Sequence, residues 1–352
     1  MRRCGQFLAI MVLASSAAAA DVLTGWSSTP AVGLGPLLLR SQSPFNLLQL
    51  TPTPLAPVTV ERGRLAPGVL GSWNNYFDVD PGGRYLIDAE TVSLTFGAAY
   101  GITDALDVSV VLPVTYRGGG ILDGFVEWFE GRVGAANRTR RDYPRDRFLV
   151  LLHGEDGRTY RLAGDASGWG LEDGSATVRY QIARGSETTP AILAGFGVRI
   201  PTGREHSLHS SGGMDIEAGL SVGQRLGRFN VYGTGSVMRH SRPDILGIRL
   251  RRTQWSLASA VEYRATSRTS YLLQSLVTSP SAERFGGFAR PTYEIALGFK
   301  RVMSPELLLE ASVLENLFVF DNSPDVGFHL GLVWHPHPRH AARGALTSHV
   351  PP

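Results

Sequence analysis

The stretch TVSLTFGAAYGI, residues 91–102, alternates strictly between two kinds of side chain. Its even-numbered positions are apolar, and its odd-numbered positions are small or polar. Successive side chains of a β-strand point to opposite faces, so a period of two predicts a strand with one apolar face. Transmembrane strands need roughly 9–11 residues, whereas strands of soluble proteins usually have about 5–6. The length of this stretch therefore favours a strand that crosses a membrane.

The same alternation recurs along the chain from about residue 64. It predicts an all-β fold, an antiparallel transmembrane β-barrel of about twelve strands, because such barrels alternate apolar outward and polar inward positions. A soluble sandwich alternates too, but its strands are shorter. The expected strands are 64–77, 90–102, 105–116, 169–183, 190–201, 214–226, 228–240, 254–265, 269–278, 292–302, 306–318 and 325–335.

The connections between these strands alternate in length. Long connections, such as 117–168, follow the odd-numbered strands, and short ones, such as Thr103-Asp104, follow the even-numbered strands. Outer-membrane barrels have short periplasmic turns and longer external loops. The alternation therefore predicts periplasmic termini and external long loops.

The N-terminus has the features of a secretory signal peptide. Arg2 and Arg3 precede a short apolar core, and Ala18-Ala19-Ala20 precedes Asp21. A basic start, an apolar core and a small-residue site define such a peptide. The core is shorter than the roughly 20 apolar residues that a membrane helix needs. We expect cleavage after residue 20 and localisation in the bacterial outer membrane.

The remaining chain has few chemical options. The one cysteine, Cys4, lies in the signal peptide, so disulfides and thiolate sites are excluded after cleavage. Loss of Arg2 and Arg3 lowers the formal charge from +3 to +1, which predicts no nucleic-acid partner. Later apolar stretches are too short for a membrane helix. We expect no cofactor, no metal and no catalytic residue.

Two sets of side chains follow from the barrel prediction. Trp255 and Tyr263 share one strand face, and about 3.4 Å per residue with roughly 40° of tilt separates them by about 20 Å across the membrane. With Trp334 they are candidates for the interfacial aromatic girdles. Charged residues on the polar face are candidates for lining the lumen, either as a selectivity lining or as a sealing ion-pair network: Arg179, Arg199, Glu217, Glu262, Glu294, Lys300 and Glu310.

Three segments depart from the period of two. Residues 21–63 are rich in Pro and Leu and are expected to lie in the lumen or beside the barrel in the periplasm. Within the longest connection, residues 121–133 have helical spacing, and Asp156-Gly157 lies between two apolar runs as in a hairpin. Residues 336–352 are expected to be a disordered tail, with the barrel domain spanning 64–335. Histidines at 335, 337, 340 and 349 suggest metal binding or a solvated tail.

Two external loops offer alternative chemistry. Arginines of the longest loop are suited to lipopolysaccharide phosphates or simply to solvent: Arg132, Arg138, Arg140, Arg141, Arg145 and Arg147. Another loop places His206 and His209 beside Ser207, Ser210 and Ser211, the residue types of a hydrolase. No spacing matches an outer-membrane phospholipase or protease, so this loop is expected to be polar surface.

Several short motifs resemble a bacterial outer-membrane family known as domain of unknown function three-one-eight-seven. They occur in order over most of the chain: Gly35-Pro36, Arg40 to Pro44, Ser72-Trp73-Asn74-Asn75-Tyr76, Tyr100 to Asp104, Leu112-Pro113, Gly170-Leu171-Glu172-Asp173-Gly174, Ile200 to Gly203 and Pro324 to Gly331. The resemblance implies a barrel and no reaction. Phe129-Glu130 departs from the Phe-His pair expected in the family.

We therefore expect a channel or transporter that passes a small solute or lipid-like molecule. The alternatives are a non-conducting structural or surface-interaction barrel and, less favoured, an outer-membrane hydrolase. The expected partners are outer-membrane lipid, lipopolysaccharide and the barrel-assembly machinery. The substrate, the pore diameter and the oligomeric state do not follow from the sequence.

Overall fold

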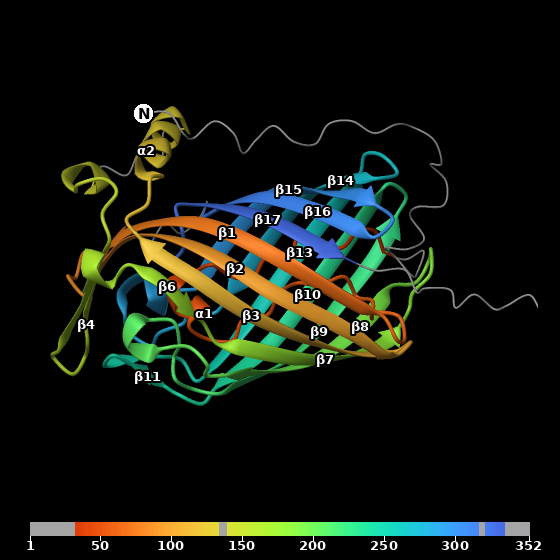
Figure 1. Ribbon diagram of the computed structural model, residues 1–352, viewed down its shortest axis with the longest axis horizontal. Helices are drawn as coiled ribbons and strands as arrows, with labels where there is room; N and C mark the ends of the chain where they lie inside the picture. The colour runs from red at the N-terminus through yellow and green to blue at the C-terminus, as the bar shows by residue number, and fades with distance from the viewer. Residues whose placement is uncertain (1–31, 134–138, 317–320, 335–352) are drawn as a thin grey trace, which may run out of the picture.

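The computed structural model describes residues 32–133, 139–316 and 321–334. The predicted signal peptide and the predicted disordered tail lie outside these residues. Within them, fifteen strands form one sheet, and twelve of these close into an antiparallel barrel because β1 (Leu65–Val79) pairs with β17 (Val326–Trp334). The predicted fold class is confirmed. Figure 1 shows the tilted strands of the barrel wall from the side.

The ten strands between these two follow one another around the wall. Every neighbouring pair is antiparallel, so the ring leaves no exposed strand edge, as a lipid environment requires. In order they are β2 (Tyr85–Thr103), β3 (Leu106–Gly118), β7 (Gly174–Ala183), β8 (Ala191–Ile200), β9 (Asp215–Leu226), β10 (Phe229–His240), β13 (Thr253–Arg264), β14 (Thr269–Thr278), β15 (Thr292–Ser304) and β16 (Leu307–Glu315).

The period of two decides which face of the wall each side chain takes. Leu94, Phe96 and Tyr100 of β2 point outward and are 37%, 50% and 46% exposed. Large apolar side chains are equally exposed on the other strands, for example Phe196 at 51% and Leu297 at 65%. A continuous exposed apolar belt is unfavourable in water and favourable in hydrocarbon.

Two strands differ from the sequence prediction. The second strand begins at Tyr85 rather than at residue 90, because its first residues pair with the end of β1 on one side and with β4 (Leu149–His153) on the other. The predicted strand 169–183 is divided into β6 (Gly168–Leu171) and β7, which both pair with β3. Between Val111 and Val114 of β3, three steps face the four steps from Ser175 to Leu171, so the opposite strand carries one extra residue.

The two ends of the barrel are unlike. One end, here called the turn end, carries short connections such as Gly227-Arg228. The other, the loop end, carries α2 (Asp123–Val133) and the hairpin of β4 and β5 (Thr159–Ala163), which confirm the predicted helix and hairpin of the longest loop. Other loop-end elements are β11 (Asp244–Ile245), β12 (Ile248–Arg249) and the 3-10 turns η1 (Thr139–Asp142), η2 (Gly164–Ala166), η3 (Glu205–Ser207) and η4 (Gly286–Ala289). No helix among the described residues is long and apolar enough to cross a membrane.

Candidate functional site

Residues 32–60, here called the lumenal segment, lie inside the barrel. Their side-chain and backbone partners lie first near the turn end, then at the loop end, where α1 (Pro44–Leu47) forms, and finally near the turn end again. The segment therefore makes one excursion through the lumen and returns before β1 begins. Figure 1 shows α1 inside the wall at the loop end.

The outgoing leg is held near the turn end by Tyr232 and Glu262. The Tyr232 hydroxyl accepts hydrogen bonds from the amides of Gly33 and Gly35 at 2.9 and 3.2 Å and donates to Glu262 Oε2 at 2.6 Å. Glu262 Oε1 accepts from the Leu34 amide at 3.1 Å. A Cβ at position 33 would lie 2.4 Å from the Glu262 carboxylate. A side chain at position 33 would therefore displace the Glu262 carboxylate, which glycine leaves in place.

A buried ion pair holds the next part of the segment. Lys300 Nζ lies 3.0 Å from Glu310 Oε2 and donates to the Leu34 carbonyl at 3.3 Å, while Glu310 accepts from the Leu38 amide at 3.1 Å. Leu37 and Leu39 pack against an apolar patch of the inner wall formed by Leu272, Leu276, Ala296 and Leu314. Each charge of the pair thus also satisfies a backbone group of the lumenal segment, which offsets part of its desolvation cost.

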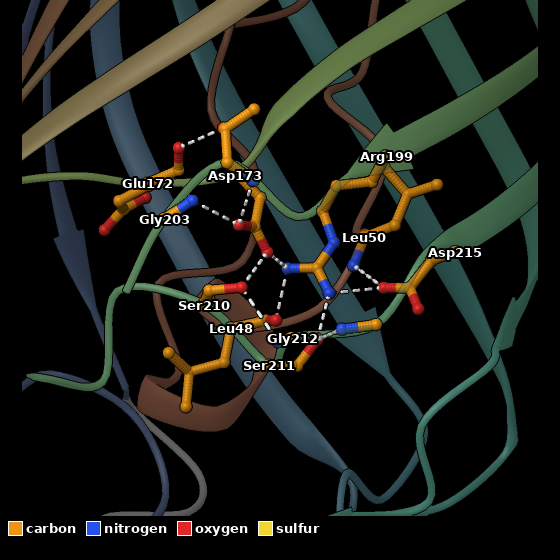
Figure 2. A network of polar contacts seen from close by, with 12 residues as sticks. Leu48, Leu50, Glu172, Asp173, Arg199, Gly203, Ser210, Ser211, Gly212 and Asp215 are labelled. Carbon is orange, nitrogen blue, oxygen red and sulfur yellow. Dashed lines mark hydrogen bonds and ion pairs between the residues drawn. The ribbon is translucent and has the colours of Figure 1, made fainter. Parts of the chain in front are cut away.

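At the loop end, Arg199, Asp173 and Asp215 form what we call the Arg199 latch (Figure 2). The Arg199 guanidinium lies 2.8 Å from Asp173 and 2.7 Å from Asp215 and donates to the Leu48 carbonyl at the end of α1. Asp215 accepts from the Leu50 amide at 2.9 Å. The latch therefore holds the backbone on both sides of residue 49 to strands β8 and β9.

The latch also fixes the loop between β8 and β9. Asp173 accepts from the Thr202 and Gly203 amides at 3.1 and 2.9 Å and from the Ser210 hydroxyl at 2.8 Å. The Ser211 hydroxyl accepts from Arg199 at 2.5 Å. One network thus connects the lumenal segment, the wall and a loop-end connection (Figure 2).

The returning leg is held by Gln181 and Asp107. Gln181 accepts from the Thr59 amide at 3.0 Å and donates to the Pro57 carbonyl at 2.8 Å. Asp107 accepts from the Val60 amide at 2.7 Å and from two nitrogens of Arg179 at 2.7 and 2.6 Å. Arg179 therefore orients the carboxylate that binds the segment, without touching the segment itself.

The structure places six of the seven candidate lumen-lining residues in these contacts. Arg199, Glu262, Glu294, Lys300 and Glu310 bind backbone groups of the lumenal segment directly, with Glu294 accepting from the Gln42 amide at 2.8 Å, and Arg179 acts through Asp107. Glu217 is only partly buried, and its Oε2 atom has no hydrogen-bond partner among the described residues. The girdle candidates Trp255, Tyr263 and Trp334 are 43%, 37% and 47% exposed.

Other residues that hold the segment were not singled out from the sequence, among them Asp107, Asp173, Gln181, Asp215 and Tyr232. Their positions in the sequence have the same alternating pattern as polar side chains that face water in a lumen. The sequence signal available was the Glu172-Asp173 motif, which carried the family resemblance only. Nothing in the pattern pairs Gln181, Asp215 or Tyr232 with backbone groups more than a hundred residues away.

In the loop with the candidate hydrolase residues, His209 contacts a serine of the same loop and the backbone of β3. His209 Nδ1 lies 2.8 Å from the Ser207 hydroxyl, and its Nε2 lies 3.3 Å from the Thr115 carbonyl. Burial lowers the pKa of the His209 imidazole to about 4, and the charge of Arg117 acts in the same direction, whereas that of Glu172 opposes it. Ser210 and Ser211 belong to the Arg199 latch. The side chain of His206 lies outside what the structure describes.

One arginine of the longest loop is not available to lipopolysaccharide. Arg140 is buried, lies 2.5 Å from Asp325, and also contacts Asp123 and Asn75. It joins the base of α2 to the loop before β17. Burial in this network excludes Arg140 from the expected phosphate contacts. No group of three or more His, Cys, Asp or Glu is placed to hold a metal ion in the described part of the chain.

A closed antiparallel wall, apolar outside and polar inside, defines the class of outer-membrane-type β-barrels. The chain belongs to the family described as "Protein of unknown function (DUF3187)", which matches residues 12–335 and confirms the resemblance noted above. No curated protein matches the chain.

Among solved structures, the "COG4313 outer membrane channel from Pseudomonas putida F1" is 13% identical, with a TM-score of 0.54 over 81% of this chain and 100% of that one. At this identity the likeness establishes the fold alone. A Pseudomonas aeruginosa FadL homologue is 10% identical, with a TM-score of 0.38 over 90% and 98% of the two chains. The NanC porin is 11% identical, with a TM-score of 0.43 over 77% and 100%.

Proposed function

We propose that the protein is an outer-membrane transporter for a small solute or lipid-like molecule, and that the lumenal segment closes its path at rest. The observation that carries this proposal is that wall side chains hold the segment by hydrogen bonds to its backbone. Glu262 accepts such a bond at the start of the segment, and Asp107 accepts one at its end. Such bonds can be exchanged for bonds to water, because the net gain of a hydrogen bond to a charged group is only about 1.5–3 kcal/mol.

The orientation follows from the two ends of the barrel. The turn end would face the periplasm and the loop end the outside, as in barrels with short periplasmic turns. Export by a cleaved signal peptide and insertion by the barrel-assembly machinery belong to this proposal. The lumenal segment would then move toward the periplasm when a substrate passes.

The loop end also offers a surface for lipid. Phe125 and Trp128 of α2 are 41% and 55% exposed. Phe125 packs 5.8 Å from Phe328 on the barrel wall, and Arg132 lies over the Trp128 ring at 5.2 Å. Aromatic side chains prefer the membrane interface, and guanidinium groups pair with phosphates. We assign outer-leaflet lipid and lipopolysaccharide as the partners of this helix.

The test of transport is conductance in planar bilayers, together with solute uptake by proteoliposomes. The signal-stripped chain should conduct rarely, and a variant lacking residues 32–60 should conduct steadily. Folding of both is checked by their heat-dependent migration in gels. A folded deletion variant that passes neither ions nor solutes would refute the transporter.

The alternative is a non-conducting barrel that acts through its surface, favoured by the presence of the lumenal segment inside the barrel and by the exposed aromatic side chains of α2. Replacing residues 121–142 by a short linker separates the two functions. If the alternative holds, this replacement abolishes binding to lipopolysaccharide vesicles, and neither the full chain nor the variant lacking residues 32–60 is permeable. The transporter requires that this replacement leave the conductance of the deletion variant unchanged.

A further inference from the structure

An apolar cavity of about 70 Å³ lies at the loop end, between α1, the inner wall and the covering loops. We call it the loop-end chamber. α1 and the residue after it contribute Pro44, Phe45, Leu47 and Leu48, and the wall contributes Tyr76, Ile87 and Ala89. The covering loops contribute Phe148, Val150, Leu152, Leu162 and Leu208, and the polar lining consists of Thr91, Thr115, Arg117 and Glu172.

The lining of the chamber suits an organic molecule better than water. One buried water needs about 10–15 Å³ and two to four polar partners, so a space of this size would need many partners to hold ordered water. Its four polar side chains lie among twelve apolar ones. Protein interiors are otherwise packed closely, and an apolar cavity left empty forfeits dispersion contacts.

The polar lining holds one cation, Arg117, and one anion, Glu172, and the Glu172 carboxylate also pairs with Arg40 outside the lining. Arg117 donates to the Ser207 carbonyl at 2.6 Å and lies 3.6 Å from Glu172. Glu172 is also 3.2 Å from Arg40 and accepts from the Thr115 hydroxyl at 2.8 Å. Two guanidinium groups therefore surround one carboxylate. A guanidinium has five N–H donors, and the 3.6 Å contact with Glu172 is long. Arg117 therefore has donors left for a second carboxylate.

The cover of the chamber is a strained loop. Leu208 follows η3 with φ 55° and ψ 32°, in the left-handed region that side chains other than glycine seldom adopt. Its amide donates to the Glu205 carbonyl at 2.9 Å. Leu152 and Leu162 come from the β4–β5 hairpin, which extends beyond the rim of the barrel. On its outer side the chamber is thus bounded by loops rather than by the wall.

We propose that the loop-end chamber binds a small monocarboxylate with an apolar body, such as a single aromatic ring or a short alkyl chain. The carboxylate pairs with Arg117, and the body lies among the apolar side chains of α1 and the hairpin. This inference rests on the proposed transport function, in which the lumenal segment moves when a substrate passes. The occupant would contact α1, which is part of that segment. The Leu48 carbonyl at the end of that helix is held by Arg199, so an occupant acts on the Arg199 latch.

The test is calorimetry on the full chain in lipid nanodiscs, with benzoate and uncharged benzyl alcohol as probes. Ala89→Phe fills the chamber from β2, and Ala98→Phe on the outward face of the same strand is its matched control. We expect Ala89→Phe to weaken benzoate binding at least about tenfold and Ala98→Phe to change it less than about twofold. Arg117→Gln should weaken benzoate about tenfold and benzyl alcohol less than about threefold.

Equal benzoate affinity in the two phenylalanine variants, or no benzoate binding by the unaltered chain, overturns the chamber as a binding site. Equal weakening of both probes by Arg117→Gln overturns the carboxylate assignment. The two proposals fail separately. A chain that binds benzoate but whose deletion variant is impermeable contradicts transport alone, and a permeable deletion variant with no benzoate binding in the full chain contradicts the chamber alone.

Discussion

The outer and inner faces of the same twelve strands are built on different principles. On the outer face, side chains such as Leu297 and Phe196 are about half or more exposed, and any large apolar residue would serve in their place. On the inner face, Lys300 and Arg199 each bind particular atoms of the lumenal segment. The outer face is thus specified by the kind of solvent it meets, and the inner face by individual partners.

Breaking one inner partnership should have the largest effect. Lys300→Met removes the cation from Glu310 and leaves a buried carboxylate, which we expect to cost about 3–5 kcal/mol of unfolding free energy. The measurement is urea unfolding in lipid vesicles, followed by tryptophan fluorescence. The double variant with Glu310→Gln should recover part of the loss, because the uncompensated charge is gone. A loss below about 1 kcal/mol for the single variant would mean that water screens the pair.

A charge on the outer face should cost somewhat less and depend on depth. Leu297→Arg lies midway along β15 and should cost about 2–4 kcal/mol, the cost of an arginine at the bilayer midplane. Leu226→Arg, at the end of β9, is the matched control and should cost about 0–1 kcal/mol. The same unfolding experiment measures both. Equal costs at the two depths would contradict the assignment of this face to hydrocarbon.

This contrast explains how much the sequence could predict. The alternation in residues 91–102 arises because one face of the strand meets hydrocarbon and the other meets a polar interior. The strands and the outer apolar belt can therefore be predicted from it. The helix and the hairpin of the longest loop follow from local patterns as well. The early start of β2 at Tyr85 depends on pairing with both β1 and β4, and the division between β6 and β7 depends on one extra residue opposite β3. Tertiary pairing sets both.

The site was less accessible to such reasoning. Polar residues such as Glu262 and Lys300 were expected to face the lumen, but the same pattern suits a water-filled pore. Their partners are backbone amides and carbonyls of a Pro-rich segment, and every residue type except proline carries both groups. The periodicity of a strand therefore contains no information on which backbone group a carboxylate such as Asp215 will bind.

The smallest expected effect concerns the loop between β8 and β9 at the loop end. The pKa of His209 is about 4 in the folded protein and 6.5 in the open loop, so the open loop binds more protons between these values. The closed loop should therefore lose stability as the pH falls from about 6.5 toward 4, and be unaffected above that window. Hydrogen exchange of residues 202–214 at pH 7.5 and 5 measures this opening, after correction for the intrinsic exchange rate. In His209→Gln the corrected opening should not change with pH, and a variant that retains the dependence would contradict the role of this histidine.

The path of the lumenal segment has a topological consequence. Its outgoing leg passes Tyr232 and Glu262 near the turn end, and its returning leg passes Gln181 and Asp107 at the same end. The segment is therefore an unthreaded loop, with its base at one mouth of a continuous ring. Withdrawing residues 32–60 through that mouth requires no pair between β1 and β17 to separate.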